Sequence, residues 1–260
     1  MEVVIVSDSA ASGTLVAGAI AECVRQRPNA VLGLATGSSP LPVYRDLERR
    51  VKEGSLSLAH CKAFLLDEYV GLSAGHPQSY RATIQREVID RLDIPAEAVL
   101  GPDGSAEDLP AACAAYEEAI KAAGGVDLQL LGIGSDGHIG FNEPVSSFAS
   151  RTRVKTLTAQ TRTDNARFFG SEEEVPWHVI TQGVGTILEA RHLVLVVTGE
   201  SKADAVAQAV EGPISAFMPA SALQLHPHST LVADEAAASQ LKLAQYYRQT
   251  YETKPSWQGL

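Results

Sequence analysis

The sequence predicts an α/β fold: a single, doubly wound domain with a mostly parallel sheet and helices on both faces. Two observations predict it. Short apolar runs alternate with amphipathic stretches along the chain, which is the pattern of repeated strand–helix units. Most of these runs are continuously apolar, as is typical of strands buried on both sides in a parallel sheet. We see no repeat and no Pro-, Gly- or Ser-rich linker, so residues 1–260 are expected to form one Rossmann-like catalytic domain.

Six strands are expected, each an apolar run bounded by polar or turn-forming residues. In chain order they are Val3–Val6, Val31–Leu34, Ala63–Leu66, Leu128–Ile133, Leu193–Val197 and Thr230–Ala233. In a parallel sheet their carboxyl ends lie at one edge, and doubly wound proteins bind ligands beyond that edge. The loops that follow these strands are therefore where functional residues are expected.

Three helices have clear start or stop signals. Ser39 is expected to cap a helix that has Pro40 at its first position. Ser79 is expected to begin a second helix, with apolar residues at helical spacing after it. The Ala-rich stretch Leu109–Ala123 predicts a third, which stops at Gly124-Gly125.

Composition and charge narrow the class of protein. The chain has 45% apolar and 20% charged residues, which excludes a mainly disordered chain. Its formal net charge of −10 makes nucleic acid and anionic membrane surfaces poor partners. The sequence has no secretory leader pattern and no apolar run near the ~20 residues that span a bilayer. Its three cysteines lack paired spacing, so we expect a cytoplasmic protein with reduced thiols.

Two of the loops have the residues of an anion site. Thr36, Gly37, Ser38 and Ser39 lead from a strand into a helix, and free N–H groups at a helix N-terminus bind phosphate. An ordinary capped turn is the alternative. Lys202 lies in the first turn after another strand, where the helix dipole disfavours a cation unless an anion is bound. A solvated surface lysine is the alternative there.

Two other loops have acid–base residues. Asp67 and Glu68 follow an apolar strand, where burial can raise a carboxylate pKa and make a general base; a solvated pair or a helix cap is the alternative. Gly134 opens a Gly-rich turn in which carboxylates surround His138. A neighbouring carboxylate fixes the tautomer of an imidazole and stabilises its charged form. Because no second His or Cys is near, a metal site is the less favoured alternative. The four loops together favour an enzyme that acts on a small phosphorylated substrate.

Six sequence segments resemble the glucosamine-6-phosphate deaminase family, also called the glucosamine/galactosamine-6-phosphate isomerase family. They are LATGSSP, LLDEYVGL, LGIGSDGHIGFNEP, SRTRVKTLT, NARFF and GESKA, and the resemblance runs in order from about Val31 to Val232. The resemblance implies conversion of glucosamine 6-phosphate and water to fructose 6-phosphate and ammonia, with no metal or cofactor. Asp67 matches the family's proton-transfer base. His138, flanked by Asp136 and Glu143, matches the residue that assists opening of the pyranose ring.

The resemblance also assigns substrate contacts. Lys202 and the Thr36–Ser39 loop match the phosphate site, and Gly134 is expected to contact the substrate as well. Arg167 matches an arginine on a mobile lid, which is expected to span about residues 158–182 and to close over the sugar.

A second phosphate site is also expected. Arg153 and Lys155 alternate, so on a strand their side chains share a face; spacing alone favours a solvated edge strand. In allosteric members of the family, Ser146, Arg153 and Lys155 match residues that bind N-acetylglucosamine 6-phosphate between subunits, which implies a homo-oligomer and suggests a hexamer. Two departures oppose this transfer. Arg248 is present where the family has a tyrosine, and the chain starts with Met1-Glu2 rather than with a basic residue.

Two other classes of function stay open. A 6-phosphogluconolactonase would hydrolyse a sugar-phosphate lactone with a water-activating histidine. It would need no base at C2, so Asp67 discriminates between the two enzymes. A non-catalytic sugar-phosphate sensor would be expected to have a DNA-binding segment, and these residues supply none.

Overall fold

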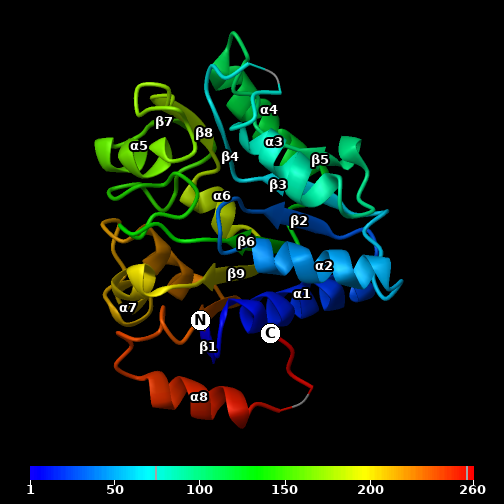
Figure 1. The fold of residues 1–260 in the computed structure, drawn as a ribbon, viewed down its shortest axis with the longest axis vertical. Helices are drawn as coiled ribbons and strands as arrows, with labels where there is room; N and C mark the ends of the chain where they lie inside the picture. The colour runs from blue at the N-terminus through cyan, green and yellow to red at the C-terminus, as the bar shows by residue number, and fades with distance from the viewer. Residues whose placement is uncertain (74, 256) are drawn as a thin grey trace.

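A seven-stranded parallel sheet forms the centre of the protein (Figure 1). The structure is a computed structural model that describes residues 1–73, 75–255 and 257–260. The sheet has the order β1-β10-β9-β6-β2-β3-β5, and its neighbouring strands are parallel. Its strands are β1 (Glu2–Val6), β2 (Val31–Leu34), β3 (Lys62–Leu65), β5 (Val99–Leu100), β6 (Leu128–Leu131), β9 (His192–Val197) and β10 (Ser229–Asp234). The predicted fold class is confirmed.

All six predicted strands are present; β2 has the predicted bounds, and the ends of the others differ from the prediction by at most two residues. Every residue of β2, β6 and β9 is buried, which explains why these strands have no alternating pattern. The sequence does not predict β5, because two residues at the edge of the sheet leave too short an apolar run.

A second, antiparallel sheet continues from the carboxyl end of β3. It has the order β4-β8-β7, with β4 at Asp67–Tyr69, β8 at His178–Thr181 and β7 at Arg153–Thr156. Asp67 and Arg153 both pair with Thr181, so the three form one row with their side chains on one face. The sequence does not predict this sheet, because its strands are short and rich in polar residues.

Helices connect the strands and surround the large sheet (Figure 1). The α-helices are α1 (Ser9–Gln26), α2 (Leu41–Lys52), α3 (Tyr80–Ile84), α4 (Leu109–Ala122), α5 (Ala159–Ala166), α6 (Val184–Leu188), α7 (Ala203–Glu211) and α8 (Ala244–Glu252). Shorter 3-10 stretches lie at Ala96–Ala98, Glu200–Lys202 and Pro219–Leu225, and a π-helical turn at Gln85–Ile89 follows α3. Helices α1 and α2 pack side by side, and α8 lies beside β1, where the two chain ends are close together (Figure 1).

The helix signals are confirmed with one correction. Helix α2 begins at Leu41 and its N-cap residue is Pro40, so Ser39 does not cap this helix. The reason is that Pro40 already has helical dihedral angles, while Ser39 Oγ lies 3.4 Å from Thr198 Oγ1 in another loop. Ser79 caps α3 as predicted, because its Oγ accepts a backbone N–H at 3.0 Å. Helix α4 ends at the predicted pair of glycines, both of which have positive φ.

Two apolar clusters hold the elements together. The larger one lies on and around the seven-stranded sheet. The smaller one packs the second sheet against the loop that follows β6, and consists of Tyr69, Phe141, Leu157, Val175 and Val179. All three cysteines are free, and two of them are buried. Among the helices of the described residues, none is both long and apolar enough to cross a membrane.

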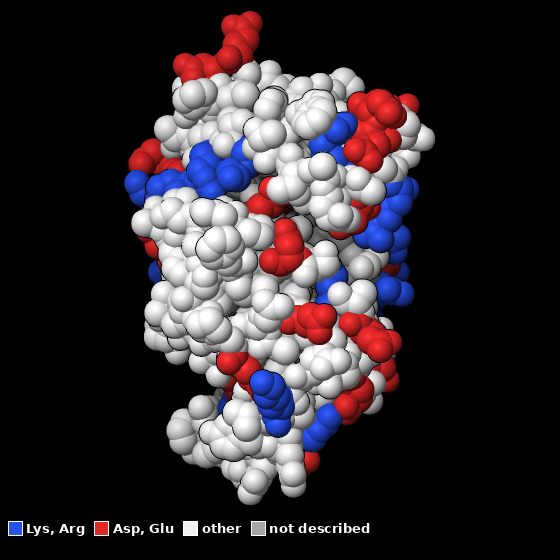
Figure 2. Space-filling model, turned by 90° about the vertical axis from the view of Figure 1, so that its left-hand side faces the viewer, with Lys and Arg blue, Asp and Glu red and all other residues white. Residues whose placement is uncertain are grey.

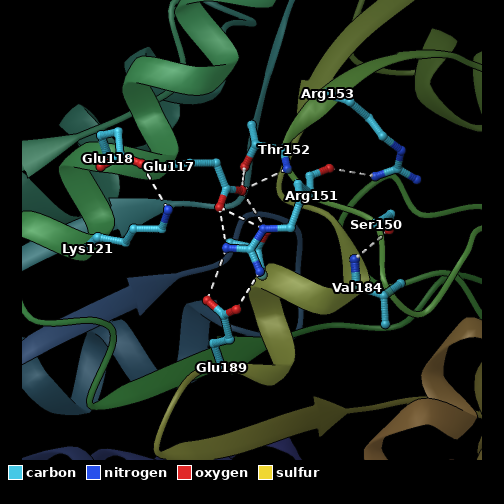
Figure 3. Close-up of polar contacts among 10 residues, drawn as sticks. Glu117, Glu118, Lys121, Ser150, Arg151, Thr152, Arg153, Val184 and Glu189 are labelled. Atoms are coloured by element: carbon cyan, nitrogen blue, oxygen red, sulfur yellow. Dashed lines mark hydrogen bonds and ion pairs between the residues drawn. The ribbon is translucent and has the colours of Figure 1, made fainter.

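A buried carboxylate joins α4 to β7 and α6. Glu117 accepts hydrogen bonds from the Thr152 N–H (2.7 Å), the Thr152 hydroxyl (2.5 Å) and the Thr186 hydroxyl (2.6 Å). Arg151 donates to the other carboxylate oxygen and also pairs with Glu189 (Figure 3). Burial raises the pKa of Glu117, but these hydrogen bonds outweigh it and hold the pKa below its usual range.

We predict that Glu117→Gln lowers the free energy of unfolding by about 2–4 kcal/mol at pH 7, because charge-assisted hydrogen bonds are lost inside the protein. Urea unfolding measures the change. Glu118→Gln is the matched control, because Glu118 is exposed and forms a surface ion pair with Lys121; its cost should be at most about 0.5 kcal/mol. The folded-state pKa of Glu117 is lowered, so the difference from wild type should shrink below about pH 4. Equal costs for the two variants would contradict the prediction.

Candidate functional site

Four neighbouring strands of the large sheet end at the candidate site. Strands β9, β6, β2 and β3 lie side by side, and the segments after their carboxyl ends contain Lys202, His138, the Thr36–Ser39 loop and Asp67. The direction in which the strands are added reverses between β2 and β6, and open α/β sheets bind ligands at such a point. Figure 2 looks onto this side of the molecule and shows a hollow near its middle, with acidic and basic side chains around it.

Asp67 and Glu68 are adjacent and both buried, but their environments differ. The Glu68 carboxylate accepts hydrogen bonds from the backbone N–H groups of Tyr69, Tyr80 and Arg81, at 2.8–3.0 Å, and so fixes the start of α3. Within the described ranges, no group donates a hydrogen bond to the Asp67 carboxylate. The helix-cap alternative therefore applies to Glu68, and Asp67 is left available for chemistry.

Asp67 has the environment of a general base. Burial, and then the charge of Glu68, raises the pKa of Asp67 to about 8. A Cβ placed on Gly140 would lie 3.6 Å from Asp67 Oδ2 and 2.9 Å from Thr181 Oγ1, so the carboxyl group faces the loop that follows β6. A base is most effective when its pKa is near the working pH, and a cation bound beside Asp67 would favour the charged form further.

The segment 134–143, which we call the β6 loop, holds His138 against Asp136. His138 Nδ1 lies 2.6 Å from Asp136 Oδ1, and the His138 N–H donates to the same oxygen at 3.2 Å. Burial raises the pKa of Asp136, but the hydrogen bond and charge of His138 outweigh it and keep the pKa below its usual range. The imidazole lies directly against Gly134, where a Cβ would be 2.2 Å from ring atoms. With Nδ1 fixed by a carboxylate, Nε2 is the nitrogen that can exchange a proton with a ligand.

Glu143 is placed differently from the expectation that it flanks His138. Its Oε1 accepts hydrogen bonds from the Thr158 N–H and hydroxyl, both at 3.1 Å, and from the Thr161 hydroxyl at 2.6 Å. In the part of the chain that the structure describes, no hydrogen bond joins Glu143 to His138. The physical reason is that the start of α5 offers three donors and a favourable helix dipole to a carboxylate. Glu143 therefore joins the β6 loop to the segment that begins at Thr158.

The anion-site candidates lie on two loops that touch. Ser39 Oγ is 3.4 Å from Thr198 Oγ1, which joins the Thr36–Ser39 loop to the loop of Lys202. Thr36 and Ser39 are half-buried, whereas Gly37 and Ser38 are exposed. Burial lowers the pKa of Lys202, the charge of Asp136 opposes this, and that of Arg167 adds to it. Charges from the β6 loop and from the end of α5 thus act on the lysine.

The expected lid, residues 158–182, contains α5 and β8. Arg167 is exposed at the end of α5, with its guanidinium 4.7 Å from the centre of the Phe168 ring. Phe169 packs against the smaller apolar cluster, and the Arg162 guanidinium lies 3.8 Å from the centre of the Trp177 ring. The last residues of the segment form β8, which pairs on both sides. A lid would therefore move only the part before β8.

The three effector-site candidates lie on or beside β7. Arg153 donates to Ser146 Oγ at 3.3 Å and to Asn142 Oδ1 at 2.9 Å. Lys155 is half-buried on the same face of β7. The structure therefore brings Ser146 and Arg153 together and leaves Lys155 two residues along the strand.

Three buried polar residues of the site are not singled out by the sequence analysis. Thr181 Oγ1 accepts the Phe141 N–H at 3.0 Å. Gln182 donates to the Leu65 carbonyl at 2.9 Å, and Asn142 donates to the Gln182 carbonyl at 2.8 Å. A Thr-Gln pair that closes an apolar run just before a glycine is the signal that could have found the first two. Asn142 lies inside the specific Phe-Asn-Glu-Pro block, but its amide is neither an acid, a base nor a nucleophile, so the sequence does not mark it as a candidate.

The arrangement can move protons on a small anionic molecule. A buried carboxyl group, a histidine–aspartate pair and two touching loops that contain hydroxyl groups and a lysine all follow neighbouring strands of one sheet. Within residues 1–73, 75–255 and 257–260, no group of three or more His, Cys, Asp or Glu side chains could hold a metal ion.

Comparison with known proteins identifies the family. The family model for glucosamine-6-phosphate isomerases/6-phosphogluconolactonase matches residues 7–232. The chain belongs to this family. Among the family's members, glucosamine-6-phosphate deaminases from Streptomyces coelicolor, Arthrobacter sp. and Mycolicibacterium smegmatis are 64%, 63% and 59% identical to it, over the full length of both chains. The resemblance drawn from the six sequence segments is confirmed.

Solved structures of the family share the fold. One described as a monomeric glucosamine-6-phosphate deaminase superposes with a TM-score of 0.90 at 42% identity, covering 92% of this chain and 100% of that one. The 6-phosphogluconolactonase from Trypanosoma cruzi gives 0.70 at 20% identity, covering 93% and 97%. The second likeness concerns the fold alone.

The raised pKa of Asp67 predicts a gain in stability when its charge is removed. An unfolded Asp ionises near pH 4, whereas Asp67 in the folded protein ionises near pH 8. This group therefore destabilises the fold increasingly as pH rises from about 4 to 8. Asp67→Asn should raise the free energy of unfolding by about 1–3 kcal/mol at pH 8 and by less at pH 5.

Urea unfolding at the two pH values measures this gain. Glu68→Gln is the control, because Glu68 holds three backbone N–H groups and its loss should destabilise the protein at both pH values. An Asp67→Asn protein that is no more stable than wild type at pH 8 would contradict the raised pKa.

Proposed function

We infer that the protein converts glucosamine 6-phosphate and water to fructose 6-phosphate and ammonia. The observation that supports this most directly is the match over the full chain, at 57–64% identity, to curated glucosamine-6-phosphate deaminases. The site fits the reaction, because Asp67 is a buried carboxyl group without a hydrogen-bond donor in the described part of the chain. Hydrolysis of a lactone needs no such base, and 6-phosphogluconolactonases resemble the chain only distantly.

Each proposed step uses one group of the site. His138, oriented by Asp136, moves a proton between the ring oxygen and the C1 hydroxyl and opens the pyranose. The Asp67 carboxylate then removes the proton from C2 and returns it to C1, as a carboxylate base does in triose isomerisation. The C2 imine that results adds water and releases ammonia, which leaves the ketone of fructose 6-phosphate. Glu143 acts by holding the β6 loop to α5.

The phosphate group is proposed to bind between the Thr36–Ser39 loop and Lys202, with Gly134 beside the sugar. Residues 1–260 are proposed to act as one catalytic domain. The part of segment 158–182 that precedes β8 closes over the substrate as a lid, and Arg167 contacts the substrate from it. The proposed reaction takes place in the cytoplasm and needs no metal or other cofactor, so activity should survive exhaustive chelation.

The deciding experiment supplies glucosamine 6-phosphate to the pure protein and measures ammonia and fructose 6-phosphate together. Equal amounts of both products are expected. Hydrolysis of 6-phosphogluconolactone without ammonia would indicate the lactonase instead. Tight binding of glucosamine 6-phosphate with no product would indicate a sensor.

The role of Asp67 as the base has its own test. Asp67→Asn should lower kcat by about 10² or more while substrate still binds, and wild type in deuterated water should place deuterium at C1 of the product.

Loss of the proposed phosphate contacts should weaken substrate binding. Charge-assisted hydrogen bonds are worth about 1.5–3 kcal/mol each, so Lys202→Met and Arg167→Met should raise KM about tenfold or more. Arg191→Met is the control, because Arg191 pairs with Asp127 away from this site. Steady-state kinetics measures the change, and an unaltered KM in Lys202→Met would remove this lysine from the phosphate site.

We also propose that Ser146, Arg153 and Lys155 bind N-acetylglucosamine 6-phosphate in a homo-oligomer, with a hexamer as the expected form. The Ser146–Arg153 contact supports an anion site there. The relative described as monomeric makes the mass in solution the first measurement. Activation should then be seen in saturation curves, with a coupling of about 1–3 kcal/mol, and should be lost in Lys155→Ala. Identical hyperbolic curves with and without effector, or a monomer at assay concentration, would contradict this regulation.

A further inference from the structure

The β6 loop rests on a row of three residues in the small sheet. Asp67, Thr181 and Arg153 are paired across β4, β8 and β7, so their side chains share a face. Gly140 lies against Asp67 Oδ2 and Thr181 Oγ1. The next loop residue, Phe141, donates its N–H to Thr181 Oγ1. The one after it, Asn142, accepts a hydrogen bond from the Arg153 guanidinium. Three consecutive residues of the loop therefore meet the row in order.

Asn142 makes the side-chain hydrogen bonds that join the β6 loop to the small sheet. Its side chain is fully buried and its hydrogen-bonding groups are engaged. Its Nδ2 donates to the Ile139 carbonyl at 3.0 Å and to the Gln182 carbonyl at 2.8 Å, while its Oδ1 accepts from Arg153 at 2.9 Å. One amide thus joins the residue next to His138 to β7 and to the residue that follows β8. A buried polar group with every partner in place fixes one geometry, because each lost partner leaves another group unsatisfied.

Arg153 is itself held on a fixed strand. The residue before it, Thr152, donates its N–H and its hydroxyl to Glu117 of α4 (Figure 3). Arg153 also donates to the Arg151 carbonyl at 3.3 Å. Arg153 is therefore anchored to α4 through Thr152, and its guanidinium contacts the β6 loop at Asn142.

We propose that Asn142 and Arg153 form a positioning pair that holds the β6 loop, with His138, in register with Asp67 for the reaction. The pair acts through the loop and touches no reacting atom. This inference rests on the proposed deaminase activity, whose kcat is one readout. Because a displacement of about 1 Å in a catalytic group can cost ~10² in rate, loss of the pair should lower kcat. Because the phosphate contacts lie on other loops, KM should change little.

The test uses Arg153→Met, which keeps the length of the side chain, and Asn142→Asp, which keeps its shape but removes both donated hydrogen bonds. Without any added effector, each should lower kcat by about 10- to 100-fold with KM within threefold of wild type. The double variant should be no more than about threefold slower than the slower single variant, because the two residues act as a unit. Arg153→Lys, which keeps a donor and the charge, should recover part of kcat.

Arg151→Met is the matched control, since Arg151 is the neighbouring arginine whose side chain bonds to Glu117 and Glu189 and not to the loop. It should lower the melting temperature and leave kcat within twofold. Hydrogen–deuterium exchange gives a readout that does not depend on activity. Peptides covering residues 134–143 should exchange faster in Arg153→Met than in wild type, and their exchange rate in Arg151→Met should equal that of wild type.

A kcat within twofold of wild type in Arg153→Met, unchanged exchange of the loop in that variant, or losses that multiply in the double variant would overturn the proposal. So would a loss of kcat in Arg151→Met equal to that in Arg153→Met, since the effect would then follow stability. Turnover by the wild type in the same assay reports separately on the proposed deaminase activity.

Discussion

The burial of one carboxyl group, that of Asp67, is the constraint on which the rest of the site depends. A carboxyl group kept from water and without a hydrogen-bond donor costs folding free energy, so the strand that bears it must be held by other contacts. Glu68, the next residue, binds the start of α3 through three backbone N–H groups, and β8 pairs with β4 along its length. The same short strand thus contains a reactive group and the anchor that keeps it buried.

Two sheets with different geometry position different groups of the site. The parallel sheet brings the Thr36–Ser39 loop, the β6 loop and Lys202 to one edge, because its strands all end there. The antiparallel sheet adds Asp67 from the side, in a row with Thr181 and Arg153. The distance between the acid–base groups is therefore set by how the β6 loop docks on the small sheet, and that docking depends on buried amide and hydroxyl groups.

The parallel sheet was predictable because its strands are buried on both faces and leave continuous apolar runs, as in β9. The small sheet was not, because its strands take their order from pairing between distant segments, which no local pattern encodes. The same limit explains Glu143: the specific block around His138 identifies it, but only the fold shows that the start of α5 takes its carboxylate. Ser39 likewise meets Thr198, a partner 159 residues away.

The close approach of the His138 ring to Gly134 has a consequence for mutational tolerance. A Cβ at Gly134 would lie 2.2 Å from the imidazole, and one at Gly137 would lie 1.9 Å from the sulfur of Met218, whereas Gly132 has no neighbour within 4 Å of its Cβ position. A saturation library would therefore return glycine at positions 134 and 137 of the β6 loop, and a range of residues at position 132 just before it. Variation that changes substrate preference therefore has to enter at other positions, since residues 134 and 137 have almost no sequence freedom.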